Sequence, residues 1–143
     1  MSNDQLQNLA SSEAIELWKH LLSTGGTDKD RMITIVNLLL GFSATIFGYF
    51  VTAPAASSVL AVLGILISGL AIYIVVLYRA HAYWNWAKAE CLVKCSPVLR
   101  DLVPPGDTPK GRAGVFKVLL FLTCSSLIVH LITLVWVYAS FGR

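Results

Sequence analysis

The chain has 143 residues, of which 56% are hydrophobic and 13% are charged, and its mean hydropathy is +0.69. Soluble domains average about 25% charged and about 45–50% apolar residues, so both departures indicate lipid as the solvent. The length suits a single domain, which excludes a multidomain soluble enzyme, a disulfide-framed secreted module and a disordered tail. A net charge of +3 is too small to indicate a nucleic-acid partner. The composition therefore predicts an integral membrane protein.

Three stretches are long and apolar enough to cross a bilayer, which needs about 20 residues. They cover residues 32–52, 59–78 and 118–141, and none contains Lys, Arg, Asp or Glu. Backbone polar groups in lipid must bond within their own segment, so we expect three transmembrane helices and an all-α fold. We expect no signal peptide, because the first apolar run begins only at residue 32, behind a polar segment.

The basic residues predict the orientation. Ten of the 11 Lys and Arg residues lie before the first span or between residues 79 and 117, and only Arg143 lies elsewhere. Basic residues favour the cytoplasmic side. We therefore expect a multi-pass protein of the cell (inner) membrane, with a cytoplasmic N-terminus, a cytoplasmic loop at 79–117 and the C-terminus outside.

The polar segments are also expected to be helical. Residues 1–26 form an amphipathic cytoplasmic helix, separate from the three-span domain at 27–143, with an apolar face of Leu6, Leu9, Ala14, Leu17, Trp18 and Leu21. Gly25-Gly26 is expected to end this helix, and Thr27 to Asp30 resembles a capping box that opens the next one. The second span should continue as a helix to about Cys95. Ser96-Pro97 then predicts a short helix ending near Leu102, followed by a proline-rich linker at 104–109.

Small and polar residues form a stripe at helical spacing on each span. The stripes are Thr34, Asn37, Gly41, Ala44 and Gly48; Ser57, Ala61, Gly64, Ser68 and Ala71; and Thr123, Ser126, His130 and Thr133. Small residues let helix backbones approach closely in lipid. One interpretation is that the stripes hold the three helices of one protomer together. The other is that at least one stripe faces a partner subunit or a water-filled pore.

His130 lies at the centre of the third span, where an ionisable side chain indicates a functional site. If the imidazole lines a pore, its protonation should change the conductance as the pH passes through the usual histidine pKa of about 6.5. Alternatively, a neutral imidazole bonds a neighbour such as Asn37, Ser68 or Thr133 and links the helices. Proton transport is not expected, because no span contains Asp or Glu.

The remaining chemistry-bearing residues have plain interpretations. Cys91 and Cys95, four residues apart, lack the spacing of a zinc site and are expected to be reduced thiols, so no metal or cofactor is predicted. Arg79, Tyr83, Trp84 and Trp86 are typical of the membrane interface. The sequence contains no nucleophile elbow, zinc-protease motif or P-loop, so we do not expect an enzyme.

Asp30-Arg31 before the first span, and Arg79-x3-Tyr83-x-Asn85-x2-Lys88-x-Glu90 after the second, resemble the small bacterial SLATT-type membrane effectors. The resemblance covers residues 27 to about 92, and the third span departs from the family's two-span pattern. It implies a pore that opens when an antiviral defence system is triggered. With no sensor domain in this sequence, the trigger would come from a partner.

Two hypotheses of function follow. In the first, the protein is a homo-oligomer in the lipid bilayer that forms or gates an ion-conducting pore. In the second, it is a non-catalytic accessory or anchoring subunit that docks on a larger membrane complex, or recruits a soluble protein, through its cytoplasmic parts.

Overall fold

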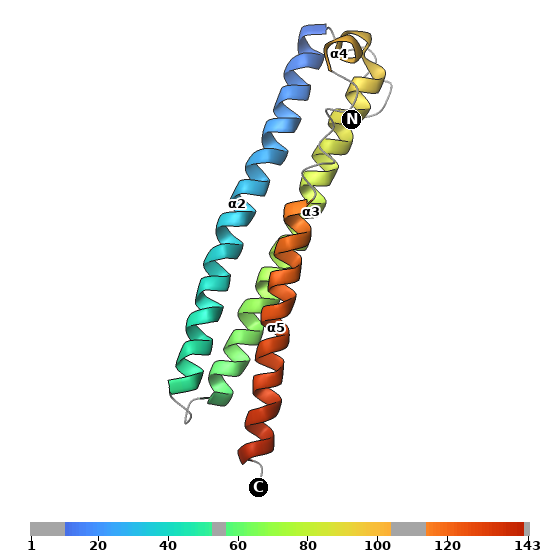
Figure 1. Cartoon of the computed structure of the whole chain (residues 1–143). Helices are drawn as coiled ribbons and strands as arrows, with labels where there is room; N and C mark the ends of the chain where they lie inside the picture. Colours follow the sequence, from blue (N-terminus) through green and yellow to red (C-terminus); the bar gives the residue numbers. More distant parts are fainter. Residues whose placement is uncertain (1–10, 53–56, 104–113, 142–143) are drawn as a thin grey trace. The chain divides into compact units, whose positions relative to one another are not determined.

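The computed structural model describes residues 11–52, 57–103 and 114–141, and within these ranges every residue except Ser96 and Val103 is helical. The helices are α2 (Ser11–Thr52), α3 (Ser57–Cys95), α4 (Pro97–Leu102) and α5 (Gly114–Phe141) (Figure 1). Three of them, α2, α3 and α5, are long and apolar enough to cross a membrane. The predicted all-α, three-span architecture of a multi-pass membrane protein is confirmed.

The chain divides into two compact units. The first, called the head unit, comprises residues up to Asp30 together with Tyr78–Gly114. The second, called the span unit, comprises Arg31–Leu77 together with the residues from Val115 onward. Helices α2 and α3 contribute to both units, whereas α4 belongs to the head unit.

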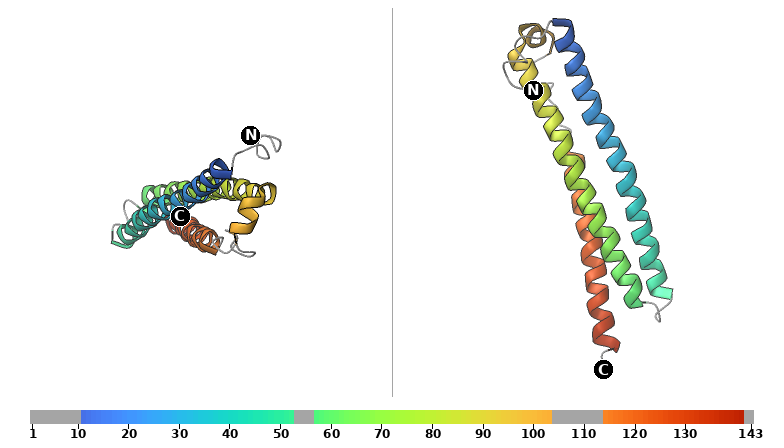
Figure 2. Two further views of the ribbon diagram at one scale, coloured as in Figure 1. Left: turned by 90° about the horizontal axis from the view of Figure 1, so that it is seen from above. Right: turned by 180° about the vertical axis from the view of Figure 1, so that it is seen from behind.

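In the span unit, α2, α3 and α5 lie side by side (Figures 1 and 2). Each helix buries one narrow face, whose residues recur at spacings of three, four or seven. These faces consist of Met32, Val36 and Ser43 on α2; Ala61, Gly64, Ser68, Ala71 and Val75 on α3; and Phe116, Leu119, Thr123, His130, Thr133 and Val137 on α5. Such spacing places side chains on one side of a helix. The packing positions predicted at Ala61, Gly64 and Ser68 are therefore buried.

The head unit has a small apolar core of its own. Ala14 of α2, Leu92 of α3 and Leu99 of α4 are buried together, and Ile15, Leu17, Trp18, Leu21 and Val93 pack against them. The apolar face predicted for the N-terminal helix is thus confirmed from Ala14 to Leu21. Leu6 and Leu9, which were predicted on the same face, lie outside the described residues.

The predicted helix end at Gly25-Gly26 is wrong, because α2 runs without a break from Ser11 to Thr52. The physical reason lies in the packing of Gly25. A Cβ atom on this residue would lie 2.5 Å from the indole Nε1 of Trp86, so the absent side chain makes room for the ring from α3. Gly25 therefore provides close helix–helix contact, and the Thr27–Asp30 segment is an ordinary stretch of α2.

The other helix boundaries follow the sequence. Helix α3 continues to Cys95, and Ser96 precedes α4 as an extended N-cap residue with φ −101° and ψ 118°. Pro97 occupies the first turn, where its missing N–H costs nothing. Figure 2 shows α4 turning away from the end of α3. The predicted linker at 104–109 lies outside the described residues.

Candidate functional site: polar groups of the three spans

Four polar side chains meet between the spans and form a connected hydrogen-bond cluster. The Ser43 hydroxyl on α2 lies 2.7 Å from the Nε2 atom of His130 and 2.7 Å from the Ser126 hydroxyl, both on α5. The Ser126 hydroxyl lies 3.0 Å from that of Ser68 on α3. Ser43, Ser68 and His130 are each at most 3% exposed. The cluster therefore joins all three helices in the interior of the span unit.

The order of atoms makes the hydrogen bonds directional. If Nδ1 of His130 carries the proton, Nε2 accepts from Ser43, and the hydroxyls donate in sequence from Ser68 to Ser126 to Ser43. If Nε2 carries the proton, the whole sequence reverses. Either arrangement satisfies every bridging hydroxyl, which makes the cluster stable in a region without water.

Gly64 provides the space that His130 occupies. A Cβ atom on Gly64 would overlap the Cγ, Nδ1 and Cε1 atoms of the imidazole, so only glycine lets α3 approach α5 at this level. The ring also contacts Phe47 edge-on, with centroids 6.4 Å apart. His130 is thus enclosed on two sides by its own protomer.

This arrangement explains what the cluster can do chemically. Ser126 and His130 are one helical turn apart, so the cluster lies at about one depth and extends across the bundle rather than along it. It links helices but provides no chain of groups from one membrane face to the other. Ser43, which bonds the imidazole, is only 3% exposed, so a substrate has no open approach to its hydroxyl group.

The other polar residues predicted on this face of α5 bond within their own helix. The Thr123 hydroxyl donates to the carbonyl groups of Leu119 and Leu120 at 3.0 and 3.1 Å. The Thr133 hydroxyl donates to the Val129 carbonyl at 2.8 Å. Both residues are buried in the bundle, as the interhelical interpretation of this face requires.

The stripe of the first span lies elsewhere. Thr34, Asn37, Gly41, Ala44 and Gly48 are all exposed, on the far side of α2 from Met32, Val36 and Ser43. The interpretation that Gly41, Ala44 and Gly48 hold α2 to the other helices of its protomer is therefore wrong. Asn37, one of the partners suggested for His130, does not bond it. The physical reason is that α2 packs on α3 and α5 through a different row of residues, Met32, Val36 and Ser43. Ser43, rather than Asn37, provides the polar contact with His130.

The row of small residues from Thr34 to Gly48, the α2 stripe, is one side of the exposed surface of α2, and another side carries the large apolar Leu38 and Phe42. Where the structure describes them, the outward surfaces of the other spans have no such row of small residues among their large side chains. Those of α3 and α5 carry large apolar side chains such as Leu66, Leu70, Phe121, Ile132 and Val135, each at least 49% exposed. In the most apolar window of α2 only 11% of residues are buried, against 28% for α3 and 22% for α5. A hollow of about 350 Å³, lined by Thr45, Gly48, Tyr49 and Thr52, borders the α2 stripe.

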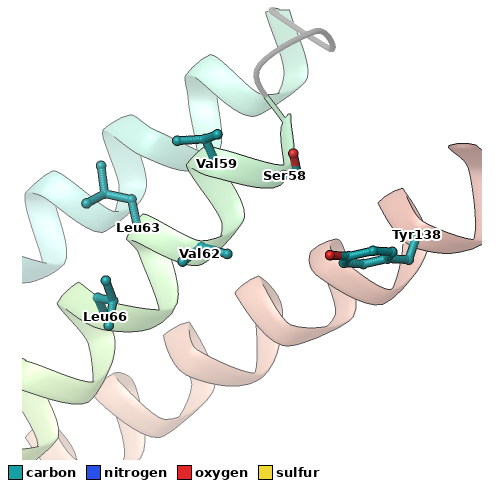
Figure 3. Close-up of a pocket in the computed structure, with 6 residues that line it drawn as sticks. All are labelled: Ser58, Val59, Val62, Leu63, Leu66 and Tyr138. Atoms are coloured by element: carbon teal, nitrogen blue, oxygen red, sulfur yellow. The ribbon is translucent and has the colours of Figure 1, made fainter.

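A second hollow lies between α3 and α5 and has another character. It measures about 460 Å³ and is lined by Ser58, Val59, Val62, Leu63, Leu66 and Tyr138. Figure 3 shows the Tyr138 ring extending from α5 toward α3, with the aliphatic side chains on α3. Its mainly aliphatic lining suits a lipid chain, with hydroxyl groups only at Ser58 and Tyr138.

In the head unit, three of the four residues predicted at the membrane interface lie on the surface. The Arg79 guanidinium lies 5.5 Å from the centroid of the Tyr83 ring, and the Lys88 ammonium lies 3.3 Å from that of Trp84. Arg79, Tyr83 and Trp84 are exposed. Trp86 is only 4% exposed and packs on Gly25, so its side chain lies in the interior of the head unit rather than on its surface.

One further contact links the two helices of the head unit. The Nδ1 atom of His81 on α3 lies 2.7 Å from the Oδ2 atom of Asp28 on α2. Asp28 belongs to the segment that the sequence indicated as a capping box. Because α2 continues through it, the carboxylate is free to bond the imidazole.

Sequence reasoning missed Ser43. The available signal was its position in the sequence. Val36 follows Met32 by four residues and Ser43 follows Val36 by seven, so all three lie on the buried side of α2. The stripe of small residues instead indicated the opposite face of the helix.

Comparison of the chain with protein-family models, with curated proteins and with solved structures found no match.

Proposed function

We propose that the protein is a homo-oligomer whose copies assemble around the α2 stripe in the inner membrane and form or gate an ion-conducting path there. The observation that carries the proposal is the contrast between outward surfaces. Those of α3 and α5 carry large apolar side chains that suit lipid. The α2 stripe is made of small residues along the span, with the polar Thr34 and Asn37 in its first part, although another side of α2 also exposes Leu38 and Phe42. Polar groups in a membrane face a protein neighbour or water rather than lipid.

The burial of the α5 face favours α2 as the helix beside the path. Thr123, His130 and Thr133 are enclosed by the helices of one protomer and are not placed to line a space shared by several. The polar residues on the outside of the span unit that remain for such a space include Thr34, Asn37 and Thr45 on α2. The resemblance to SLATT-type effectors adds the proposal that conduction serves antiviral defence, with the trigger supplied by a partner.

Thiol accessibility tests the proposal. Single cysteines at Ala44 or Gly48 would be introduced into a chain whose Cys91, Cys95 and Cys124 are replaced by alanine, and the protein reconstituted in liposomes. A charged, water-soluble thiol reagent should modify both cysteines and reduce ion flux. Val129→Cys, which is 43% exposed on α5, is the control and should stay unmodified in lipid. Liposomes that remain ion-tight both alone and with the protein's natural partners would contradict the proposal.

The alternative, an accessory subunit, is favoured if the α2 stripe contacts a different membrane chain. The mass of the complex purified in mild detergent separates the two functions. A whole-number multiple of the 15.6 kDa chain supports the homo-oligomer. A fixed stoichiometry with a second polypeptide, together with ion-tight liposomes, would replace the pore by the accessory role.

A further inference from the structure

Asn37 is a polar side chain for which the protomer offers no partner. It is exposed on α2 and makes no hydrogen bond within the part of the chain that the structure describes. It follows Met32 by five residues, which places it about 7.5 Å further into the span. At this depth hydrocarbon replaces water, so an exposed amide is as fully desolvated as a buried one. The amide needs a hydrogen-bond partner from outside the protomer.

The glycines beside Asn37 are also unexplained within the protomer. A Cβ atom on Gly41 or Gly48 would meet nothing within 4 Å. A Cβ atom on Gly64, in contrast, would overlap the His130 ring. Gly69 on α3 is equally open, so openness alone does not identify a contact. Gly41 and Gly48 differ from Gly69 because they share one side of their helix with Asn37. Ala44-x3-Gly48 has the small-xxx-small spacing that lets two helices approach closely.

We infer that the α2 stripe binds the same stripe of a second, parallel copy, with the two Asn37 amides hydrogen-bonded to each other. Copies inserted under the same Lys/Arg bias are parallel, so equal residues lie at equal depth. Each amide both donates and accepts, so the pair is self-complementary. A lipid chain supplies neither group, whereas a second copy always carries the matching amide.

This contact rests on the proposed assembly around α2 and identifies where two copies touch. In a conducting oligomer it is the closed arrangement of the path, in which neighbouring α2 helices meet and water is excluded at Asn37. Polar asparagine at a single position of a helix–helix seam is known to fix register and orientation.

Disulfide cross-linking tests the geometry. In the cysteine-free chain, single cysteines would be placed at Gly41, Ala44 or Gly48, and oxidation in membranes should give covalent dimers at all three. Leu38→Cys and Phe42→Cys are matched controls at the same depths, being 59% and 55% exposed on another side of α2. They should cross-link several-fold less. Equal cross-linking at the control positions would indicate random collision and overturn the inference.

Variants of Asn37 test the amide pair. Energy transfer between labelled copies diluted in vesicles measures association without requiring conduction. Asn37→Leu should weaken association about 3- to 20-fold, the range that membrane hydrogen bonds of about 0.6–1.7 kcal/mol represent. Asn37→Gln, which keeps the amide, should retain most of it, and Leu38→Ala should change it less than twofold. Unchanged association of Asn37→Leu would overturn the amide pair.

The two proposals fail in different ways. Cross-links at the α2 stripe, in liposomes that stay ion-tight before oxidation both alone and with the natural partners, would contradict the conducting path and leave the α2 contact standing. Ion flux through an oligomer that lacks these cross-links would do the reverse. Cross-linking and flux measured on the same liposomes therefore decide each proposal separately.

Discussion

At the scale of single residues, the membrane interior of this protein is organised by where polar groups find partners. Ser43, Ser68, Ser126 and His130 satisfy each other between the spans, and Thr123 and Thr133 bond to their own helix. Asn37 stands outside this network and faces outward. The same chemical requirement therefore explains the internal link and underlies the proposed external contact.

Gly64 and Gly69 form a matched pair for testing the internal link. Gly64→Ala places a Cβ atom in the His130 ring, whereas Gly69→Ala meets nothing within 4 Å on the same helix. We expect Gly64→Ala to destabilise the span unit by about 1–3 kcal/mol, as overpacked cores do, and Gly69→Ala to leave it unchanged or slightly more stable. Thermal unfolding in detergent measures both. A similar melting temperature for the two variants would contradict the contact.

At the scale of elements, spacing along the chain predicted which segments are helices but not where glycine serves packing. The end of α3 and the start of α4 follow from Pro97, which cannot continue a helix but fits the first turn of one. Gly25-Gly26 has the composition of a helix end. Only the structure shows that Gly25 instead makes room for the Trp86 ring of α3. Likewise, a stripe of small residues predicts that a helix packs, but it does not identify the neighbour. The α3 stripe faces its own protomer, and the α2 stripe does not.

The continuity of α2 gives a second prediction, at adjacent glycines. Gly26→Ala meets nothing within 4 Å and should stabilise the helix by about 0.5–1 kcal/mol, because alanine favours helices over glycine. Gly25→Ala should lower stability and shift the Trp86 fluorescence, because its Cβ atom displaces the indole. Chemical denaturation followed by tryptophan fluorescence distinguishes them. If both substitutions stabilised the protein, α2 and α3 would not make this contact.

At the scale of the whole molecule, the sequence predicts orientation more directly than the fold does. The Lys/Arg bias of ten to one predicts that residues 1–31 and 79–117 lie in the cytoplasm. Reporter fusions at Ser57 and after Arg143 should both report the outer side of the membrane. A fusion in the loop at 79–117 should report the cytoplasm and serves as the control. A C-terminal fusion active only in the cytoplasm would contradict the topology.

The last prediction separates the internal cluster from the proposed path. His130 bonds Ser43 on the buried side of α2, and the α2 stripe lies on the other side of that helix. Protonating or replacing the imidazole therefore adds no charge to a path beside the stripe. Ion flux through liposomes should be the same at about pH 5.5 and about pH 8, on either side of the usual imidazole pKa of about 6.5.

His130→Gln should then conduct as the unmodified chain does, because glutamine still bonds the Ser43 hydroxyl. His130→Leu should cost a few tenths to about 1.7 kcal/mol of stability, the worth of a hydrogen bond between membrane helices. Asn37→Leu, by contrast, should alter flux at both pH values. A conductance that changes with pH, and loses that response in His130→Gln, would move the conducting path from α2 to the interior of each protomer.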